Sequence, residues 1–102
     1  MRVIKKMTQE ELERMKEISK RMNISVMNTG GHIYCLYVED KTQDRELYFG
    51  YGSGKLGYDL NRLSDGAFLD IWGEIDNYNA TIEEEMEYIT QILKKFNFKV
   101  ES

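Results

Sequence analysis

The sequence contains no proline, and it has a single cysteine, Cys35, among its 102 residues. A single cysteine excludes an internal disulfide and is typical of proteins that work in a reducing compartment. No run of residues approaches the roughly 20 apolar positions of a membrane span. The basic residues Arg2, Lys5 and Lys6 are not followed by the apolar stretch of a secretory signal. We therefore expect a cytoplasmic protein that makes no contact with a membrane.

The composition is sufficient for one folded domain spanning residues 1–102. Apolar residues make up 41% of the chain and aromatic residues 12%, which is enough for a packed core at this length. The formal net charge is −4 and the isoelectric point is near 5.0. Nucleic-acid binders need a cation-rich surface to displace counterions from phosphates, so this charge disfavours direct binding to nucleic acid.

Two segments carry the signals of amphipathic helices. Residues 8–11 and 81–84 each form a capping box of threonine and glutamate, followed by apolar residues at helical spacing. The first helix is expected to run from about Thr8 to Met22 and to stop at Asn23. The buried stripes are Leu12, Met15, Ile18 and Met22 in the first helix, and Met86, Ile89, Ile92, Leu93 and Phe96 in the second.

Three strands are predicted between the helices. The segments 24–29, 32–39 and 46–51 are rich in β-branched and aromatic residues and are bounded by glycines or polar turns. The polar turn 40–45 joins the last two of these segments into an antiparallel hairpin.

The register of this hairpin follows from the position of its turn. Pairing Glu39 with Glu46 places Tyr37 beside Tyr48 on the outer face. A shift of one or two residues stays open, because like charges directly opposite each other repel. The face without small or charged positions is expected to be the core face. It consists of Tyr34, Leu36, Val38, Leu47, Phe49 and Tyr51.

The rest of the chain gives weaker signals. Residues 67–72 fit either a fourth strand or a buried segment, residues 58–63 fit a short turn of helix, and residues 98–100 fit a short terminal strand. The predicted fold class is α+β. We expect a small two-layer domain with an N-terminal helix, an antiparallel sheet of three to four strands and a C-terminal amphipathic helix.

The segment Gly52–Gly57 matches the pattern GxGxxG and follows a predicted strand. In dinucleotide-binding folds such glycines let the backbone approach a pyrophosphate, so one alternative function is a small-ligand or nucleotide-binding module. Its ligand-binding residues would be Gly52, Ser53, Gly54 and Lys55. Against this alternative, the preceding strand looks antiparallel, no βαβ unit surrounds it, and Leu56 stands where a Walker A loop needs Ser or Thr.

No catalytic set or cofactor site emerges from the sequence. His32 and Cys35 are the single residues of their kinds, and a separation of three on one strand places them on opposite faces. Asp70, Glu74 and Asp76 lie close in sequence, but their spacing does not match a calcium-binding loop. We expect no catalytic residue, no metal and no cofactor, and therefore a protein that is not an enzyme.

Acidic residues are concentrated in one part of the chain. Residues 57–92 contain nine carboxylates and a single cation, Arg62, and the whole chain contains seven tyrosines. This combination is typical of an acidic surface that meets a basic partner, with aromatic side chains as anchors. The residues expected to bind the partner are Tyr37, Tyr48, Asp70, Trp72, Glu74, Asp76, Tyr78, Glu83 and Glu84.

In composition the whole chain resembles small phage and mobile-element proteins that inhibit bacterial immunity, including the anti-CRISPR proteins. Like them it is short, acidic, free of proline, rich in Lys, Glu, Asn and Tyr, and without catalytic motifs. The resemblance implies an inhibitor that acts in the cytoplasm of a bacterial host cell, in many such proteins as a mimic of DNA. Its partner would be a larger basic protein, such as a CRISPR effector or another nuclease.

The leading hypothesis is therefore a non-enzymatic acidic protein that inhibits a nucleic-acid-handling defence protein by occupying its surface. A second hypothesis with the same electrostatic logic is an immunity or antitoxin protein that neutralises a toxin. The charge distribution also leaves a homodimer open, in which the basic N-terminal helix of one copy meets the acidic helix of another.

Overall fold

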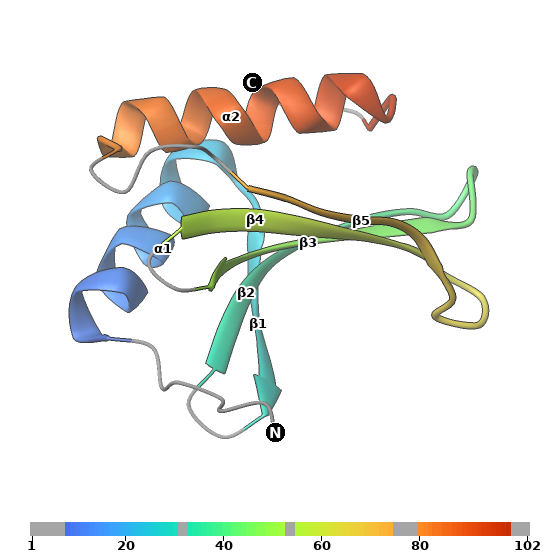
Figure 1. The fold of residues 1–102 in the computed structure, drawn as a ribbon, viewed down its shortest axis with the longest axis horizontal. Coiled ribbons are helices and arrows are strands. Elements are labelled where there is room, and N and C mark those ends of the chain that lie inside the picture. The colour runs from blue at the N-terminus through green and yellow to red at the C-terminus, as the bar shows by residue number, and fades with distance from the viewer. Residues whose placement is uncertain (1–7, 31–32, 53–54, 75–79, 99–102) are drawn as a thin grey trace.

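The computed structural model is an α+β domain in which two helices pack on an antiparallel five-stranded sheet (Figure 1). It describes residues 8–30, 33–52, 55–74 and 80–98, and for residues 30, 52, 55 and 71–74 it describes the backbone alone. The predicted fold class is confirmed, with one more strand than the three to four expected. Neither helix of the described chain has the length and apolarity needed to cross a bilayer.

Both helices begin where the capping boxes place them. Helix α1 spans Gln9–Met22 and α2 spans Ile82–Lys95, with Thr8 and Thr81 as their N-caps. Each threonine hydroxyl accepts a hydrogen bond from the third helical residue, whose glutamate accepts one from the threonine backbone in return. Asn23 ends α1 in the left-handed conformation, with φ of 55°.

The strands follow one another in space as they do in sequence. They are β1 (Ser25–Gly30), β2 (Ile33–Asp40), β3 (Arg45–Gly52), β4 (Lys55–Arg62) and β5 (Phe68–Glu74), all antiparallel to their neighbours. Glu39 pairs with Glu46, so the expected hairpin register is confirmed. Of residues 67–72, for which a buried segment was the other interpretation, all but Ala67 belong to strand β5.

The short turn of helix expected at residues 58–63 is wrong, because residues 55–62 form strand β4. Leu56, Tyr58 and Leu60 alternate along this strand and all three are buried. A period of two fits a strand packed on one face, and the eight-residue ladder with β3 satisfies the backbone polar groups. Lys99 and Val100 of the expected terminal strand lie outside the described residues.

The core lies between the helices and one face of the sheet. Met15 and Ile18 of α1 and Ile89 and Leu93 of α2 are all buried against this face. Their sheet partners alternate along the three central strands, as the hairpin register requires. The core residues contributed by these strands are Leu36, Leu47, Phe49, Leu56, Tyr58 and Leu60, with Tyr34, Val38 and Tyr51 partly buried beside them.

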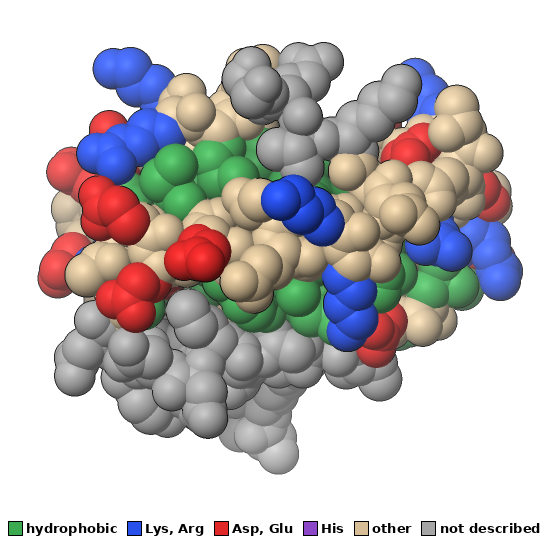
Figure 2. All heavy atoms as spheres, turned by 90° about the horizontal axis from the view of Figure 1, so that it is seen from above, with side chains coloured by type: hydrophobic (Ala, Val, Ile, Leu, Met, Phe, Trp, Pro, Cys, Tyr) green, Lys and Arg blue, Asp and Glu red, His purple; other side chains and the backbone are tan. Residues whose placement is uncertain are grey.

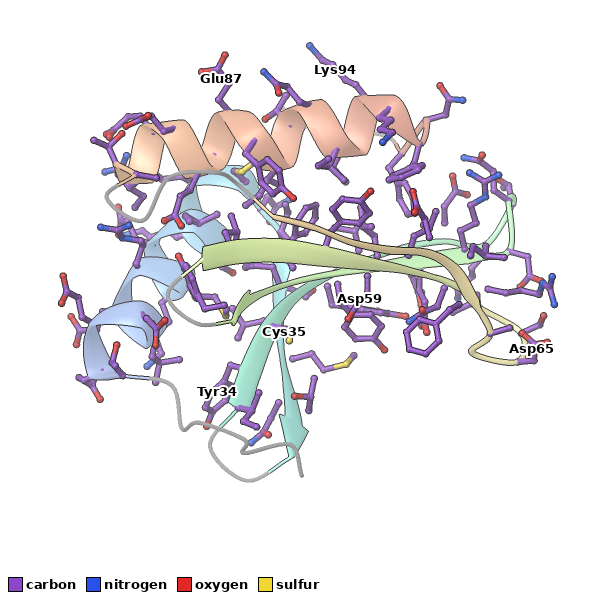
Figure 3. The ribbon with its side chains drawn as sticks, in the orientation of Figure 1. Tyr34, Cys35, Asp59, Asp65, Glu87 and Lys94 are labelled. Carbon is purple, nitrogen blue, oxygen red and sulfur yellow. The ribbon has the colours of Figure 1, made fainter. Side chains whose placement is uncertain are left out.

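No helix of the described chain covers the other face of the sheet, which we call the open face (Figure 1). Figure 3 shows Tyr34 on the helix side of β2, and Cys35 and Asp59 on the opposite side of the sheet. The open face is defined by the residues Met27, Cys35, Tyr37, Glu39, Glu46, Tyr48, Asp59 and Asn61.

Candidate binding surface on the open face of the sheet

Two tyrosines expected to bind a partner meet at the centre of the open face. Tyr37 and Tyr48 are cross-strand partners on β2 and β3, and their ring centroids lie 4.9 Å apart with planes tilted by 50°. Asp59 is the partner of Tyr48 on β4, so the three side chains form one row across the sheet. Both tyrosine side chains remain partly exposed, which leaves aromatic surface for another molecule to contact.

A second row lies beside the tyrosines and contains two carboxylates. Glu39 and Glu46 are directly opposite each other on β2 and β3, and Asn61 of β4 is the next partner along. Like charges in this arrangement destabilise a sheet by up to about 1 kcal/mol. The Nζ of Lys41 is 3.8 Å from Glu39, but with 80% of its side chain exposed this contact contributes little.

The hydroxyl of Tyr37 connects the two carboxylates. It donates toward Glu46 Oε2 at 3.0 Å and toward Glu39 Oε2 at 3.1 Å. Burial raises the pKa of Tyr37, and the hydrogen bonds and negative charges of Glu46 and Glu39 raise it further. The phenol therefore stays protonated, and the two carboxylates share the single hydrogen that it can donate.

Cys35 packs on the same face over the backbone of β3. A Cβ built on Gly50 would lie 3.1 Å from its Sγ, so the absence of a side chain at Gly50 makes room for the thiol. Burial raises the pKa of Cys35, and the charge of Asp59 adds to this effect while a hydrogen bond with Thr29 opposes it. A thiol held in its protonated form is a poor nucleophile. His32, its only candidate base in the sequence analysis, lies outside the described residues.

Asp70 was expected on the acidic surface, but it lies on the helix side of the sheet. It pairs with the core residue Leu60, and its Oδ2 accepts a hydrogen bond of 3.2 Å from the hydroxyl of Tyr58. Asp59 precedes Leu60 on β4, so strand alternation places Asp59 on the open face, on the opposite side of the sheet from Asp70. The fold thus places Asp59 and Asp70, two acids of the same part of the sequence, on opposite sides of the sheet.

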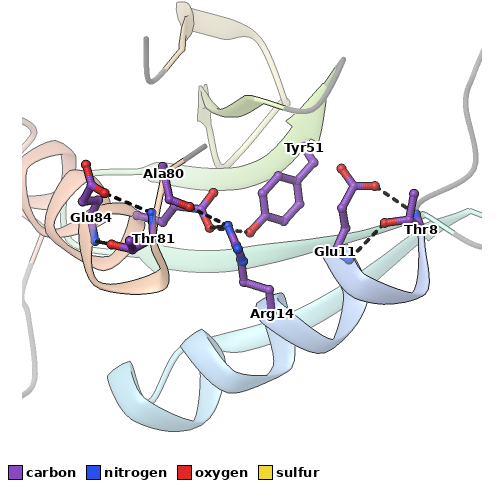
Figure 4. A network of polar contacts seen from close by, with 8 residues as sticks. Thr8, Glu11, Arg14, Tyr51, Ala80, Thr81 and Glu84 are labelled. Atoms are coloured by element: carbon purple, nitrogen blue, oxygen red, sulfur yellow. Dashed lines mark hydrogen bonds and ion pairs between the residues drawn. The ribbon is translucent and has the colours of Figure 1, made fainter. Parts of the chain in front are cut away.

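Glu83 and Glu84 lie in the helix layer and are engaged within the chain. Glu83 is 3.4 Å from Nη1 of Arg21 on α1, and the side chain of Glu84 closes the capping box with Thr81 (Figure 4). Acidic and basic side chains are interspersed over this side of the molecule (Figure 2). The acids between 57 and 92 therefore do not form one continuous surface with the tyrosine pair.

For four of the expected partner-binding residues, the structure does not describe the position of the side chain. Trp72 and Glu74 belong to β5, of which the structure describes only the backbone at these positions. Asp76 and Tyr78 lie outside the described residues. The acids that do accompany Tyr37 and Tyr48 are Glu39, Glu46 and Asp59, which the sequence analysis did not select.

The glycine-rich segment 52–57 connects two antiparallel strands. Gly52 ends β3, Lys55 begins β4 as its cross-strand partner, and Ser53 and Gly54 lie outside the described residues. In dinucleotide-binding folds the corresponding segment leads into a helix whose N-terminus receives the phosphates. Here the chain continues as a strand, so that source of phosphate affinity is missing from Gly52–Gly57.

The sequence analysis missed a polar network inside the helix layer. Glu85 has 3% of its surface exposed, and its Oε1 is 2.9 Å from Nη1 of Arg14 and 3.0 Å from the hydroxyl of Tyr51. Arg14 also donates to the carbonyl oxygen of Ala80 at 2.9 Å (Figure 4). A signal was present in the sequence, because Glu85 lies four residues before the buried Ile89 on the apolar stripe of α2.

Across the described residues, no three side chains of the metal-ligating types come together as a metal site requires. Comparison with protein-family models, with curated proteins and with solved structures found no match to this chain. The geometry and charge of the protein's own surfaces are therefore what indicates its function.

Proposed function

We propose that this protein is a non-enzymatic binding protein that uses its open face to occupy a basic surface of a larger, nucleic-acid-handling protein, such as a nuclease of bacterial defence. The observation that carries the proposal is the pair of adjacent rows on the open face of the sheet. One row holds Tyr37, Tyr48 and Asp59, and the other holds Glu39 and Glu46. Aromatic side chains surrounded by acids are suited to a cationic partner surface.

The electrostatics favour such a partner over nucleic acid itself. The three carboxylates of the open face project from adjacent strands of a chain with net charge −4. A concentration of negative charge attracts a cation-rich surface and accelerates encounter, and it repels phosphates. A partner that normally holds DNA or RNA in a basic channel would lose access to its substrate while this face occupies the channel.

The aromatic residues supply the desolvated centre that such an interface needs. Tyr37 and Tyr48 form a tilted pair, and each tyrosine contributes large contact area with few rotatable bonds. Phe68 of β5 pairs with Asn61 at the edge of the same face and leaves 70% of its surface exposed. An aromatic centre with acids beside it offers both burial and charge complementarity.

The test compares two triple variants of equal charge in a competition assay. Purified bacterial nucleases with basic substrate channels are incubated with labelled DNA and increasing amounts of the protein, at low and at high salt. The open-face variant carries Glu39→Gln, Glu46→Gln and Asp59→Asn. The control variant carries Glu10→Gln, Glu13→Gln and Glu87→Gln, which neutralises three exposed acids of the two helices.

We expect the natural protein to inhibit cleavage by at least one nuclease and the open-face variant to be weaker by about tenfold or more. The control variant should retain most of the inhibition, and the inhibition should fall as salt rises. Equal loss in both triple variants would show that net charge rather than the open face is responsible. Absence of inhibition across the panel at low salt would contradict the proposed function.

A further inference from the structure

The row containing Glu39 and Glu46 holds more negative charge than the described side chains around it neutralise. The two carboxylates share one phenolic hydrogen from Tyr37, and the one ion pair found for either of them among the described residues joins Glu39 to the exposed Lys41. Opposed carboxylates on neighbouring strands raise the free energy of the folded protein when no cation lies between them. This row is therefore a place where a cation from outside would stabilise the fold.

A second observation concerns the neighbouring residue of the same row. The Oδ1 atom of Asn61, opposite Glu46 on β4, is buried and has no hydrogen-bond donor among the described residues. A buried acceptor without a donor is costly, and natural structures rarely retain one without a reason. A ligand carrying several N–H groups would serve both carboxylates of this row, beside a residue whose amide oxygen lacks a donor.

The third observation is the aromatic pair. The rings of Tyr37 and Tyr48 lie next to the carboxylates, tilted and only 4.9 Å apart between centroids. Aromatic ring faces attract cations, and they stack well on a flat cation. The three features together favour a ligand group that is positively charged, planar and rich in hydrogen-bond donors.

Resting on the function proposed above, we propose that the Tyr37–Tyr48 pair and the Glu39–Glu46 pair form a docking site for an arginine side chain on the partner's surface. A guanidinium group has five N–H donors at the edge of a plane whose faces stack on aromatic rings. The ammonium of lysine is a compact point charge, so it cannot stack and donate at the same time. The site therefore selects arginine over lysine, and it selects basic channels rich in arginine.

The experiment uses the full chain labelled with ¹⁵N and two peptide probes of equal charge, hexa-arginine and hexa-lysine. Binding is followed by amide chemical shifts at low salt. We expect both peptides to shift amides of the open face, and hexa-arginine to bind about tenfold more tightly than hexa-lysine. The double variant Glu39→Gln with Glu46→Gln should lower the affinity for hexa-arginine to that for hexa-lysine.

The same double variant also tests whether Glu39 and Glu46 repel each other in the free protein. It is expected to increase the stability of the protein while it decreases the affinity for arginine. Removing the opposed charges should raise the urea midpoint of the free protein while it weakens arginine binding. The control variant Glu13→Gln with Glu87→Gln removes two charges from exposed helix positions and should change neither quantity. Loss of stability in the open-face double variant would overturn the proposal, because the carboxylates would then already be satisfied within the chain.

The outcomes separate this inference from the proposed function. Equal affinity of the open face for both peptides would refute the arginine site and leave a general basic partner in place. If neither peptide shifts the open face at low salt, the proposed function is itself wrong. Shifts confined to the helix layer would contradict both proposals.

Discussion

Arg14 on α1 and Glu85 on α2 form an ion pair of 2.9 Å between Nη1 and Oε1, although 71 positions separate them in the sequence. Glu85 is buried, and Tyr51 of β3 donates a second hydrogen bond to the same oxygen. The network joins both helices to one face of the sheet. It thereby helps to hold the helix layer on that side, and no helix of the described chain lies on the other side of the sheet.

Replacing Arg14 alone should lower the free energy of unfolding more than replacing both Arg14 and Glu85. Arg14→Met leaves the buried carboxylate of Glu85 with a single donor, and we expect a loss of about 3 kcal/mol in the free energy of unfolding. Arg14→Met combined with Glu85→Leu removes both charges and should be more stable than Arg14→Met alone. Urea denaturation of the two variants checks this. A double variant less stable than Arg14→Met would show that the pair contributes net stability beyond satisfying Glu85.

The stability of the protein should decrease at alkaline pH through Tyr51. Burial raises the pKa of Tyr51, and the charge and hydrogen bond of Glu85 raise it further above the ordinary value of 10.0. The folded state therefore keeps a proton that the unfolded chain loses as the pH rises through 10.0, so stability is present below this pH and lost above it. Tyr51→Phe should cost about 1 kcal/mol at neutral pH and should flatten the alkaline dependence. Thermal unfolding across the alkaline range measures both effects, and an unchanged alkaline slope in Tyr51→Phe would contradict this assignment.

The turn after β2 should contribute to stability only where Asp40 is ionised. Hydrogen bonds from Thr42 and Gln43 lower the pKa of Asp40 below the ordinary value of 3.8. Its contribution is therefore complete above pH 3.8 and is lost as the pH falls through the lowered value. Asp40→Asn should be less stable than the natural protein at neutral pH and should approach it in strong acid. Equilibrium unfolding at several pH values tests this, with Glu13→Gln as the control, and a difference that persists in strong acid would argue against it.

Gly66 is required by the backbone of the turn between β4 and β5. Its φ is +73°, where a Cβ is unfavourable, and no atom beyond Gly66 and its two chain neighbours lies within 4 Å of the position a Cβ would take. Gly66→Ala should therefore destabilise the protein by about 1 kcal/mol through backbone strain alone. Asn23→Gly, at the left-handed end of α1, should be neutral or stabilising in the same denaturation assay. An unchanged midpoint for Gly66→Ala would show that the turn relaxes to another conformation.

Local patterns in the sequence determined both helix starts and the end of α1. They also indicated the register of the β2–β3 hairpin and the face that it buries, although a shift of one or two residues stayed open until the strand pairing was known. They did so because capping boxes, helical spacing and strand alternation act over a few residues. The strand nature of residues 55–62 was not visible in this way. Leu56, Tyr58 and Leu60 do alternate, but glycines and charged residues surround them, and the pairing with β3 is what makes the segment a strand.

The sequence also predicted that Tyr37 and Tyr48 would meet on an outer face if Glu39 pairs with Glu46, and the structure has that register. Only the tertiary structure decided which acids accompany them. The acidic run between 57 and 92 is divided because strand alternation sends Asp59 and Asp70 to opposite sides, and because helix capping and ion pairing engage Glu84 and Glu83. Strand pairing between distant parts of the chain, and the side of the sheet that the helices cover, decide which charges share a surface. A local sequence pattern does not contain this information.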